Sequence, residues 1–192
     1  NWVYWIQHVR IFGVLQRIGL AYLLAGLLAL WLRKPGKIMA AIAVLLAVYT
    51  GILVAFGDPA GPFTLGGNVS GKIDTALLGS GHVYHGYRLE SGERADFDPE
   101  GLIGCLSAAC TALLGYLIGR VIYRSSKRHA AAPSDISAAP SYVVSRVFVY
   151  GMVSLALSQV LSIWIPVNKP LWSASYVFYA GGWAMLMLAL LA

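Results

Sequence analysis

Charged residues are scarce in this sequence: they make up 11% of the chain, whereas hydrophobic residues make up 58% and the mean hydropathy is +0.69. A soluble domain of 192 residues has too small a core to enclose so much apolar surface. The composition therefore excludes an ordinary water-soluble domain. A lipid bilayer must be a partner of this chain and form part of its solvent.

Cysteine and acidic residues are also few. The two cysteines, Cys105 and Cys110, lie five residues apart in one apolar segment, on different parts of a helix surface, so we expect no disulfide between them. The excess of basic residues gives a net charge of +6, but these residues cluster at the ends of apolar runs, where membrane topology accounts for them. We therefore predict no nucleic-acid partner. The chain begins at Asn1 without a methionine and ends inside an apolar run, so we expect a segment of a longer protein.

Five apolar runs are long enough to cross a bilayer as helices, since a spanning helix needs about 20 apolar residues. Backbone polar groups in lipid must bond within their own segment, and these runs lack the strict alternation of a barrel strand. The predicted fold is all-α, a polytopic transmembrane helical bundle in one domain, 1–192. The five predicted helices cover residues 13–32, 38–56, 102–123, 142–165 and 171–192.

The basic residues predict which ends of these helices face the cytoplasm. One side of the predicted membrane has a formal charge of +7, contributed by Arg33, Lys34, Lys37, Arg120, Arg124, Lys127, Arg128, Arg146 and the acid Asp135. The other side has a charge of −1 and holds seven of the eight acids. We therefore predict a multi-pass inner-membrane protein whose loops Arg33–Lys37 and Arg124–Ser141 are cytoplasmic. The loop 57–101 is predicted to be periplasmic or luminal.

The two long connections differ in composition. The cytoplasmic connection, 124–141, has the Ser, Ala and Pro content of a flexible linker, and we assign it no chemistry. The outer connection, 57–101, is far longer than a link between neighbouring helices requires. Long ordered loops in compact proteins are usually functional, so we expect the outer loop to contribute to a site.

Within the outer loop, Asp74, His82, Tyr84 and His85 are close in sequence. Neutral imidazole suits a metal ligand or an acid/base group, but two histidines three residues apart without further ligands are a weak metal signal. We predict no metal site. Two roles stay open for these side chains: hydrogen bonds that order the loop, and direct contact with a substrate.

Polar residues also stand at the outer membrane boundary. Gln16 and Arg17 fall about one turn inside the first predicted helix, where a charge is costly unless it is paired or faces a cavity. We expect Arg17 to line a polar vestibule, to pair with Asp74 or Glu100, or to extend its side chain to the interface. Asp98 reads as the N-cap of the third predicted helix, with Pro99 at its first position and Glu100 in its first turn. Desolvation at this boundary would suit Glu100 to acid/base chemistry, although the helix dipole alone accounts for an acid there.

The last two predicted helices contribute a second polar set. Ser154, Ser158 and Ser162 form a stripe with Gln159, which either lines a cavity or bonds to a neighbouring helix. Pro170 is predicted to begin the last helix, which places a group of residues at an outward helix N-terminus suited to an anion or an acyl oxygen. This group comprises Asn168, Lys169, Trp172, Ser175 and Tyr176.

Two further expectations concern packing and a pocket. Gly115 and Gly119 form a small-xxx-small pair that predicts close helix packing. Three helices that enter from the outside bring Arg17, Glu100 and Lys169 to the same membrane depth. We therefore predict that these three residues share one pocket, although no spacing among them specifies a reaction.

Four sequence motifs, RIFGVLQRIGLAY, KIDTALLGSGHVY, FDPEGLIGCLSA and IPVNKPLWSASYV, follow one another along the chain. In this order they resemble the heparan-α-glucosaminide N-acetyltransferase family and its bacterial relatives. The resemblance covers nearly the whole chain. One departure is Phe12, where the family usually has proline.

The resemblance implies a multispanning acetyltransferase that takes acetyl-CoA from the cytosol as co-substrate and acetylates an amino sugar or glycan on the far side of the membrane. The histidine that the family uses for transfer belongs to an N-terminal region that this chain lacks, so its catalytic residues are unknown, His82 does not replace that histidine, and we expect the segment alone to be inactive. Direct transfer and an acetylated histidine both fit, and homo-oligomer formation stays open. A supporting role in the pocket is implied for Arg10, Gln16, Arg17, Asp74, His82, Tyr84, Asp98, Glu100, Asn168, Lys169, Trp172, Ser175 and Tyr176.

A transporter or flippase for a saccharide or a lipid-linked substrate is the alternative from another class, because intramembrane polar residues also mark transport paths. A structural membrane subunit is the third interpretation. Release of free coenzyme A distinguishes the first two, since only an acyltransferase produces it.

Overall fold

The computed structural model describes residues 2, 9–59, 61–89, 91–95, 97–134 and 140–192. Its helices confirm the all-α prediction, and five of them are long and apolar enough to span a membrane. The described residues form no β-strand, and a single isolated bridge pairs Arg88 with Arg94. The helices in chain order are α2 (Val14–Leu32), α3 (Pro35–Phe56), α4 (Val69–Leu78), the 3₁₀ turn η1 (Ser80–His82), α5 (Gly104–Ala131), α6 (Pro140–Ser162) and α7 (Ala174–Leu191).

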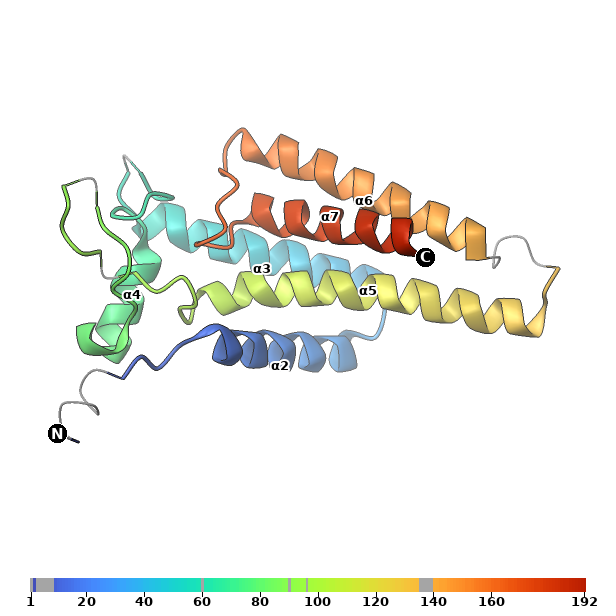
Figure 1. The fold of residues 1–192 in the computed structure, drawn as a ribbon, viewed down its shortest axis with the longest axis horizontal. Coiled ribbons are helices and arrows are strands. Elements are labelled where there is room, and N and C mark those ends of the chain that lie inside the picture. Colours follow the sequence, from blue (N-terminus) through green and yellow to red (C-terminus); the bar gives the residue numbers. More distant parts are fainter. Residues whose placement is uncertain (1, 3–8, 60, 90, 96, 135–139) are drawn as a thin grey trace.

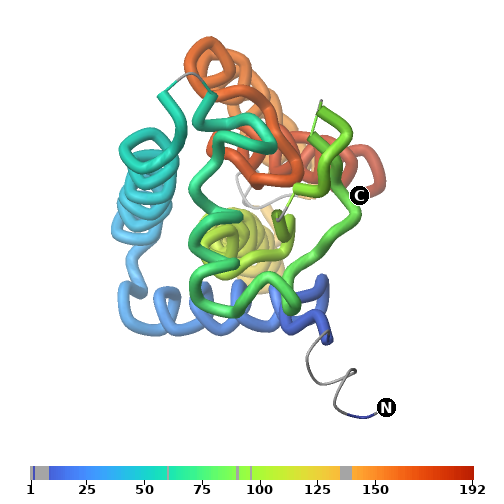
Figure 2. Tube along the Cα trace, turned by 90° about the vertical axis from the view of Figure 1, so that its left-hand side faces the viewer, coloured from blue at the N-terminus to red at the C-terminus, as the bar shows by residue number. Residues whose placement is uncertain are grey.

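The long helix α5 is the centre of the bundle and contacts α2, α3, α6 and α7. The helices α3, α5, α6 and α7 run along the long axis of the bundle, α2 crosses α5 obliquely, and α4 and the loops around it gather at one end (Figure 1 and Figure 2). Figure 2 looks along the bundle from that end and shows α2 and α3 on two adjoining sides of α5, with α6 and α7 beyond it. Residues from the outer loop, from the start of α2 and from the α6–α7 connection therefore meet at one end of the bundle.

The helices α6 and α7 pack most closely of all pairs, and glycines on both make this approach possible. A methyl group at Gly182 would lie 2.8 Å from Leu155 Cγ, and one at Gly151 would lie 3.0 Å from Leu186 Cδ2. The predicted packing role of Gly115 and Gly119 is wrong for the part of the chain that the structure describes, since no atom lies within 4 Å of a Cβ built at either. These two glycines have the spacing of a packing motif, but they lie on a face of α5 that the neighbouring helices leave open.

Two serines of the predicted polar stripe join the same pair of helices. The Ser154 hydroxyl donates to the Phe178 carbonyl at 2.7 Å, and the Ser158 hydroxyl donates to the Ser175 carbonyl at 2.8 Å. Ser162 donates to Gln159 of its own helix at 2.7 Å. Bonding between helices therefore describes Ser154 and Ser158, and Ser154 also lines a pocket of the bundle, as the other interpretation proposed.

Two predicted helix starts are wrong. Asp98 does not cap α5, which begins at Gly104; its carboxylate instead accepts the Glu100 N–H at 3.0 Å, within a separate turn. Pro170 does not begin α7, because Trp172 has a φ of 54° and interrupts the helical backbone. The N-cap is Ser173, whose hydroxyl accepts the Tyr176 N–H at 3.3 Å.

The connections also differ from their predicted form. The helix α5 continues through Arg124 to Ala131, into the segment predicted as a flexible linker. Arg, Lys and Ala favour helix, and the first proline after the start of α5 is Pro133. Residues 135–139 of that linker lie outside the described residues. The outer loop contains α4, which Asn68 caps by accepting the Gly71 N–H at 3.1 Å.

The outer surfaces of the long helices are strongly apolar. Leu15 and Trp31 of α2 are each 80% exposed, and similar side chains extend along the other spanning helices. Exposed apolar surface on this scale is stable in lipid and not in water. The chain is therefore a multi-pass membrane protein in a bilayer environment.

Candidate functional site

A cavity of about 920 Å³ runs between α2 and α5 and ends at the outer loop and the α6–α7 connection. Its outer end is polar and holds Arg17, Glu100, Lys169 and Trp172. The rest of its wall is made of apolar and small residues such as Ala25. The structure thus brings together the three residues that the sequence assigns to one pocket, and it adds the Trp172 ring.

Arg17 is the most constrained charged group of this cavity. Its side chain is buried, with 6% of the residue exposed, and it does not extend to the interface. One terminal nitrogen, Nη1, donates to the Pro99 carbonyl at 2.7 Å, and the guanidinium carbon lies 4.1 Å from the centroid of the Trp172 ring. The other nitrogens, Nε and Nη2, are buried without a hydrogen-bond partner.

The predicted pairing of Arg17 with Asp74 or Glu100 is wrong. Among the described residues, both ion pairs belong to Arg10, one with Asp98 and one with Glu100. Among the described residues no carboxylate lies within ion-pair distance of Arg17, so its direct contacts are a carbonyl dipole and an aromatic face, and Glu100 acts on it only across the cavity. In this structure the protein encloses both Nε and Nη2, so a bound molecule contacts them only if the neighbouring groups move.

Trp172 is held in place from several directions. Its indole N–H donates to the Thr111 hydroxyl at 3.0 Å, and its carbonyl accepts the Ser107 hydroxyl, both from α5. Its ring meets the Tyr176 ring edge to face, with centroids 5.0 Å apart. The indole therefore forms a fixed wall against which Arg17 stacks.

The turn before Trp172 depends on Asn168. Its side-chain oxygen accepts the Leu171 N–H at 3.0 Å, and its amide nitrogen donates to the Phe63 carbonyl of the outer loop at 3.1 Å. Ser175 is fully buried and donates to the Pro166 carbonyl at 2.9 Å. These bonds occupy Asn168 and Ser175 with the fold, so Lys169, which is exposed, is the polar residue of this turn that remains free to reach into the cavity.

An ionic cluster closes the outer side of the site. Arg10 binds Asp98 through Nε at 2.9 Å and Nη2 at 2.6 Å, and Nη2 also contacts Glu100. These bonds, first of all those to Asp98, raise the pKa of Arg10 above its ordinary value. Asp98 is 1% exposed and also accepts the Tyr84 N–H at 3.2 Å, while the Tyr84 ring lies under the Arg10 guanidinium, 4.7 Å from its centroid. The cluster fixes Glu100 at the cavity mouth.

A hydrogen bond decides between the two open roles of His82 in the outer loop. His82 is half-buried, and its Nδ1 donates to the Val9 carbonyl at 2.8 Å, so it ties the segment before α2 to η1. Loop ordering, the first of the two open roles, therefore describes His82. Among the described residues, no group of three or more His, Cys, Asp or Glu side chains is placed to hold a metal ion. Gln16 is exposed and does not line the cavity.

Asp74 lies beneath the site and is fully buried. One carboxylate oxygen accepts the Leu102 N–H at 3.0 Å, and the other, Oδ2, has no hydrogen-bond partner. A Cβ at position 101 would lie 1.8 Å from Oδ2, so only glycine fits at Gly101. Burial raises the pKa of Asp74 to about 6, with a smaller contribution from Asp98.

Sequence reasoning missed the partners that orient the site. Thr111 and Ser107 read as small residues of an apolar helix, and nothing in their spacing links them to Trp172, more than 60 positions away. Tyr22 and Tyr116 also line the cavity, on opposite walls from α2 and α5. In the sequence these two tyrosines are only aromatic residues within spanning helices. Nothing there indicates that they line a cavity one or more turns below Arg17.

Comparison with known proteins finds similarity along almost the whole chain. Heparan-alpha-glucosaminide N-acetyltransferase of Homo sapiens is 29% identical over 226 residues, covering 95% of this chain and 32% of the human protein. The protein of the same name from Mus musculus is 27% identical over 227 residues, covering 95% of this chain and 33% of the mouse protein. No family model matches. The chain spans about a third of the length of these curated relatives, and their similarity supports the family relationship that the four motifs suggest.

Proposed function

We propose that this chain forms the acceptor-side pocket of a membrane-bound N-acetyltransferase. In this proposal, acetyl-CoA from the cytosol supplies the acetyl group, and an amino sugar or glycan on the non-cytoplasmic side receives it. The similarity to two N-acetyltransferases over 95% of the chain supports a transferase. The distribution of basic residues supports the sidedness, because the polar end of the cavity, with Arg17, lies opposite to the basic loops.

The single observation that carries the proposal is the state of Arg17. A buried guanidinium with two unpaired nitrogens costs stability, about 1–3 kcal/mol for each unsatisfied donor, and we infer that a ligand entering the cavity moves the groups that enclose these nitrogens and supplies acceptors. A sugar hydroxyl, a thioester carbonyl or the oxyanion that forms from it each offers such an oxygen. The adjoining Trp172 ring provides the flat apolar face against which a sugar ring or an acyl group packs.

The polar residues at the cavity mouth divide the remaining tasks. Glu100, which Arg10 holds at the mouth, attracts the ammonium form of an amino sugar. Lys169 and Arg17 stabilise negative charge that develops on the carbonyl oxygen during attack by the amine. The proton of the amine passes to a histidine-type base outside this chain, as the family resemblance implies. Asn168 is not assigned to the oxyanion, because both ends of its amide are bound to backbone groups.

The test uses the full-length protein that carries this chain, in detergent or liposomes, with acetyl-CoA and glucosamine-type acceptors. We expect acceptor-dependent release of coenzyme A, and a decrease of about 10–100-fold for Lys169→Ala and for Arg17→Lys. Lysine at position 17 keeps the charge but loses the planar stack on Trp172 and the fork of donors. Lys72→Ala is the matched control, because Lys72 is an exposed lysine of α4 that does not line the cavity.

Two results would contradict the proposal. Equal losses in Lys169→Ala and Lys72→Ala would show that the cavity position of Lys169 is irrelevant. Uptake of a saccharide into liposomes without coenzyme A release from any amino-sugar acceptor would indicate a transporter. Unfolding midpoints of all variants, measured in the same detergent, separate a loss of activity from a loss of fold.

A further inference from the structure

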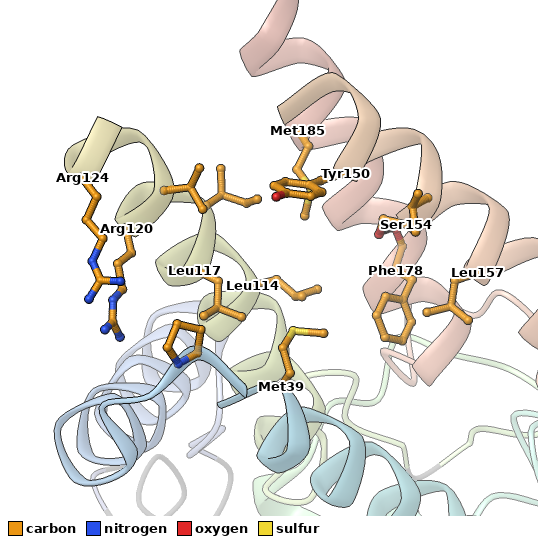
Figure 3. A pocket seen from close by; sticks show the side chains of 14 residues that line it. Met39, Leu114, Leu117, Arg120, Arg124, Tyr150, Ser154, Leu157, Phe178 and Met185 are labelled. Atoms are coloured by element: carbon orange, nitrogen blue, oxygen red, sulfur yellow. Dashed lines mark hydrogen bonds between the residues drawn. The ribbon is translucent and has the colours of Figure 1, made fainter. Parts of the chain in front are cut away.

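A second pocket, of about 380 Å³, is lined by residues of α3, α5, α6 and α7, and one of its ends lies at the basic end of the bundle. Its wall is apolar over most of its length, with Met39, Leu117 and Leu157 among the lining residues. Figure 3 shows Arg120 and Arg124 projecting side by side at one end of this pocket and Leu157 with Phe178 at the other. The pocket thus combines a cationic end and an apolar interior.

The cationic end is not neutralised within the described residues. Arg120 and Arg124 are four positions apart on α5 and therefore lie on the same face of the helix. Nη1 of Arg120 donates to the carbonyl of Arg33, which places the basic α2–α3 turn beside it. Both ion pairs between described residues belong to Arg10 at the other end of the bundle, so no described carboxylate pairs with either arginine.

The apolar part opens toward lipid. Met39 is 46% exposed and Val153 is 60% exposed, so the pocket reaches the surface that α3 and α6 present to the bilayer. A soluble anion would occupy the arginines and leave this interior empty. A phospholipid matches both parts of the pocket. Its phosphate suits the arginines, and the acyl chain linked to that phosphate suits the apolar interior next to them.

We propose that this pocket is a binding site for an anionic phospholipid of the leaflet on the basic side. Arg120 and Arg124 hold the phosphate and the negatively charged headgroup, and one acyl chain enters the pocket between α5 and α6. Basic pockets between spanning helices on the positively charged side of a membrane protein suit such lipids. The site is independent of the acetyl-transfer proposal, because it shares no residue with the Arg17 cavity.

The test is native mass spectrometry of the full-length protein, delipidated in mild detergent and titrated with phosphatidylglycerol or phosphatidylcholine of the same acyl chains. We expect wild type to prefer phosphatidylglycerol, and R120Q/R124Q to bind it about 30-fold more weakly. K127Q/R128Q is the matched control, because it removes the same charge from the next turn of α5 without touching the pocket lining. We expect this control to change the affinity by less than about 3-fold, since both side chains are exposed and do not line the pocket, which leaves only a salt-screened attraction.

A second pair of variants tests the acyl chain separately. V153W fills the pocket from α6 at an exposed position and leaves every charge in place, so we expect it to weaken both lipids by about tenfold. V149W places the same ring one turn away, outside the lining, and should have no effect. Unfolding midpoints confirm that each variant is folded.

Three results would overturn the proposal. Equal affinity of wild type for the two lipids, or equal losses in R120Q/R124Q and K127Q/R128Q, would remove the role of the two arginines. Unchanged binding in V153W would leave only attraction to surface charge. Displacement of the bound lipid by coenzyme A would assign the arginines to nucleotide phosphates instead.

Discussion

The buried carboxyl group of Asp74 makes the stability of the fold depend on pH in an unusual direction. Burial raises its pKa from an ordinary value of 3.8 to about 6, so the folded protein binds more protons than the unfolded chain between these two values. Stability contributed by this group is therefore fully present below pH 3.8 and is lost as the pH rises through 6. Above pH 6 the folded protein carries a buried negative charge whose Oδ2 has no hydrogen-bond partner.

The substitution Asp74→Asn removes this charge and changes little else. The amide keeps an oxygen to accept the Leu102 N–H, and its NH₂ group replaces the unpaired Oδ2 against Gly101. The pKa values of 6 and 3.8 correspond to a penalty of up to about 3 kcal/mol at neutral pH. For a chain of this size that is an increase of about 6–12 °C in the unfolding midpoint at pH 7.5.

The assay follows unfolding in detergent by tryptophan fluorescence, since the Trp172 ring is packed against Thr111 and Tyr176 and changes its environment when the helices separate. The informative quantity is the midpoint of Asp74→Asn minus that of wild type, measured from pH 4.5 to 8. We expect this difference to be largest above pH 6.5 and to fall to about a third of that value at pH 4.5. Glu93→Gln, at an exposed carboxylate of the outer loop, should show a small difference without this trend. A constant difference, or one that grows on acidification, would refute the reasoning.

Three further predictions concern packing and the loop. Gly182→Ala should lower the unfolding midpoint by an amount equivalent to about 1–3 kcal/mol, whereas Gly115→Ala, with open space around its Cβ, should not lower it. Tyr49→Phe should cost about 1–2 kcal/mol in thermal unfolding, because its hydroxyl donates to the Leu171 carbonyl inside the bundle, and an unchanged midpoint would mean that water replaces the donor. Arg10→Gln should speed proteolysis of the outer loop at low salt, since it leaves two carboxylates without their cation, and equal cleavage rates would contradict a closing role for the cluster.

The existence of the spanning helices was predictable from the sequence, because a run of about 20 apolar residues has few stable alternatives in lipid. Their ends were less predictable. Asp98 and Pro99 form a convincing helix start, yet α5 begins at Gly104, because the Asp98 carboxylate is used by Arg10, 88 positions away. Local capping rules cannot anticipate a long-range ion pair that uses the capping group.

The candidate site was predictable as a location but not as a set of contacts. Membrane depth alone brings Arg17, Glu100 and Lys169 to one cavity, as the sequence suggests. Which arginine meets the acids was not readable, since Arg10 and Arg17 both stand near the outer boundary and only the path of the loop decides between them. Glycine packing failed for a related reason: the spacing of Gly115 and Gly119 defines a face of a helix but not whether a partner covers it.

The geometry around Arg17 is determined by three separate segments, which is why its unpaired donors are informative. Thr111 fixes the Trp172 ring, the turn at Asp98 aims the Pro99 carbonyl, and α2 sets the depth of the guanidinium between them. A flexible arginine would turn its free nitrogens toward water, but the stack on Trp172 and the bond to Pro99 hold this one in place. Leaving two nitrogens of a buried cation unpaired costs stability, and the Arg17 side chain also lines the cavity between α2 and α5. We infer that a ligand in this cavity displaces the groups that enclose Nε and Nη2 and supplies oxygen acceptors to them.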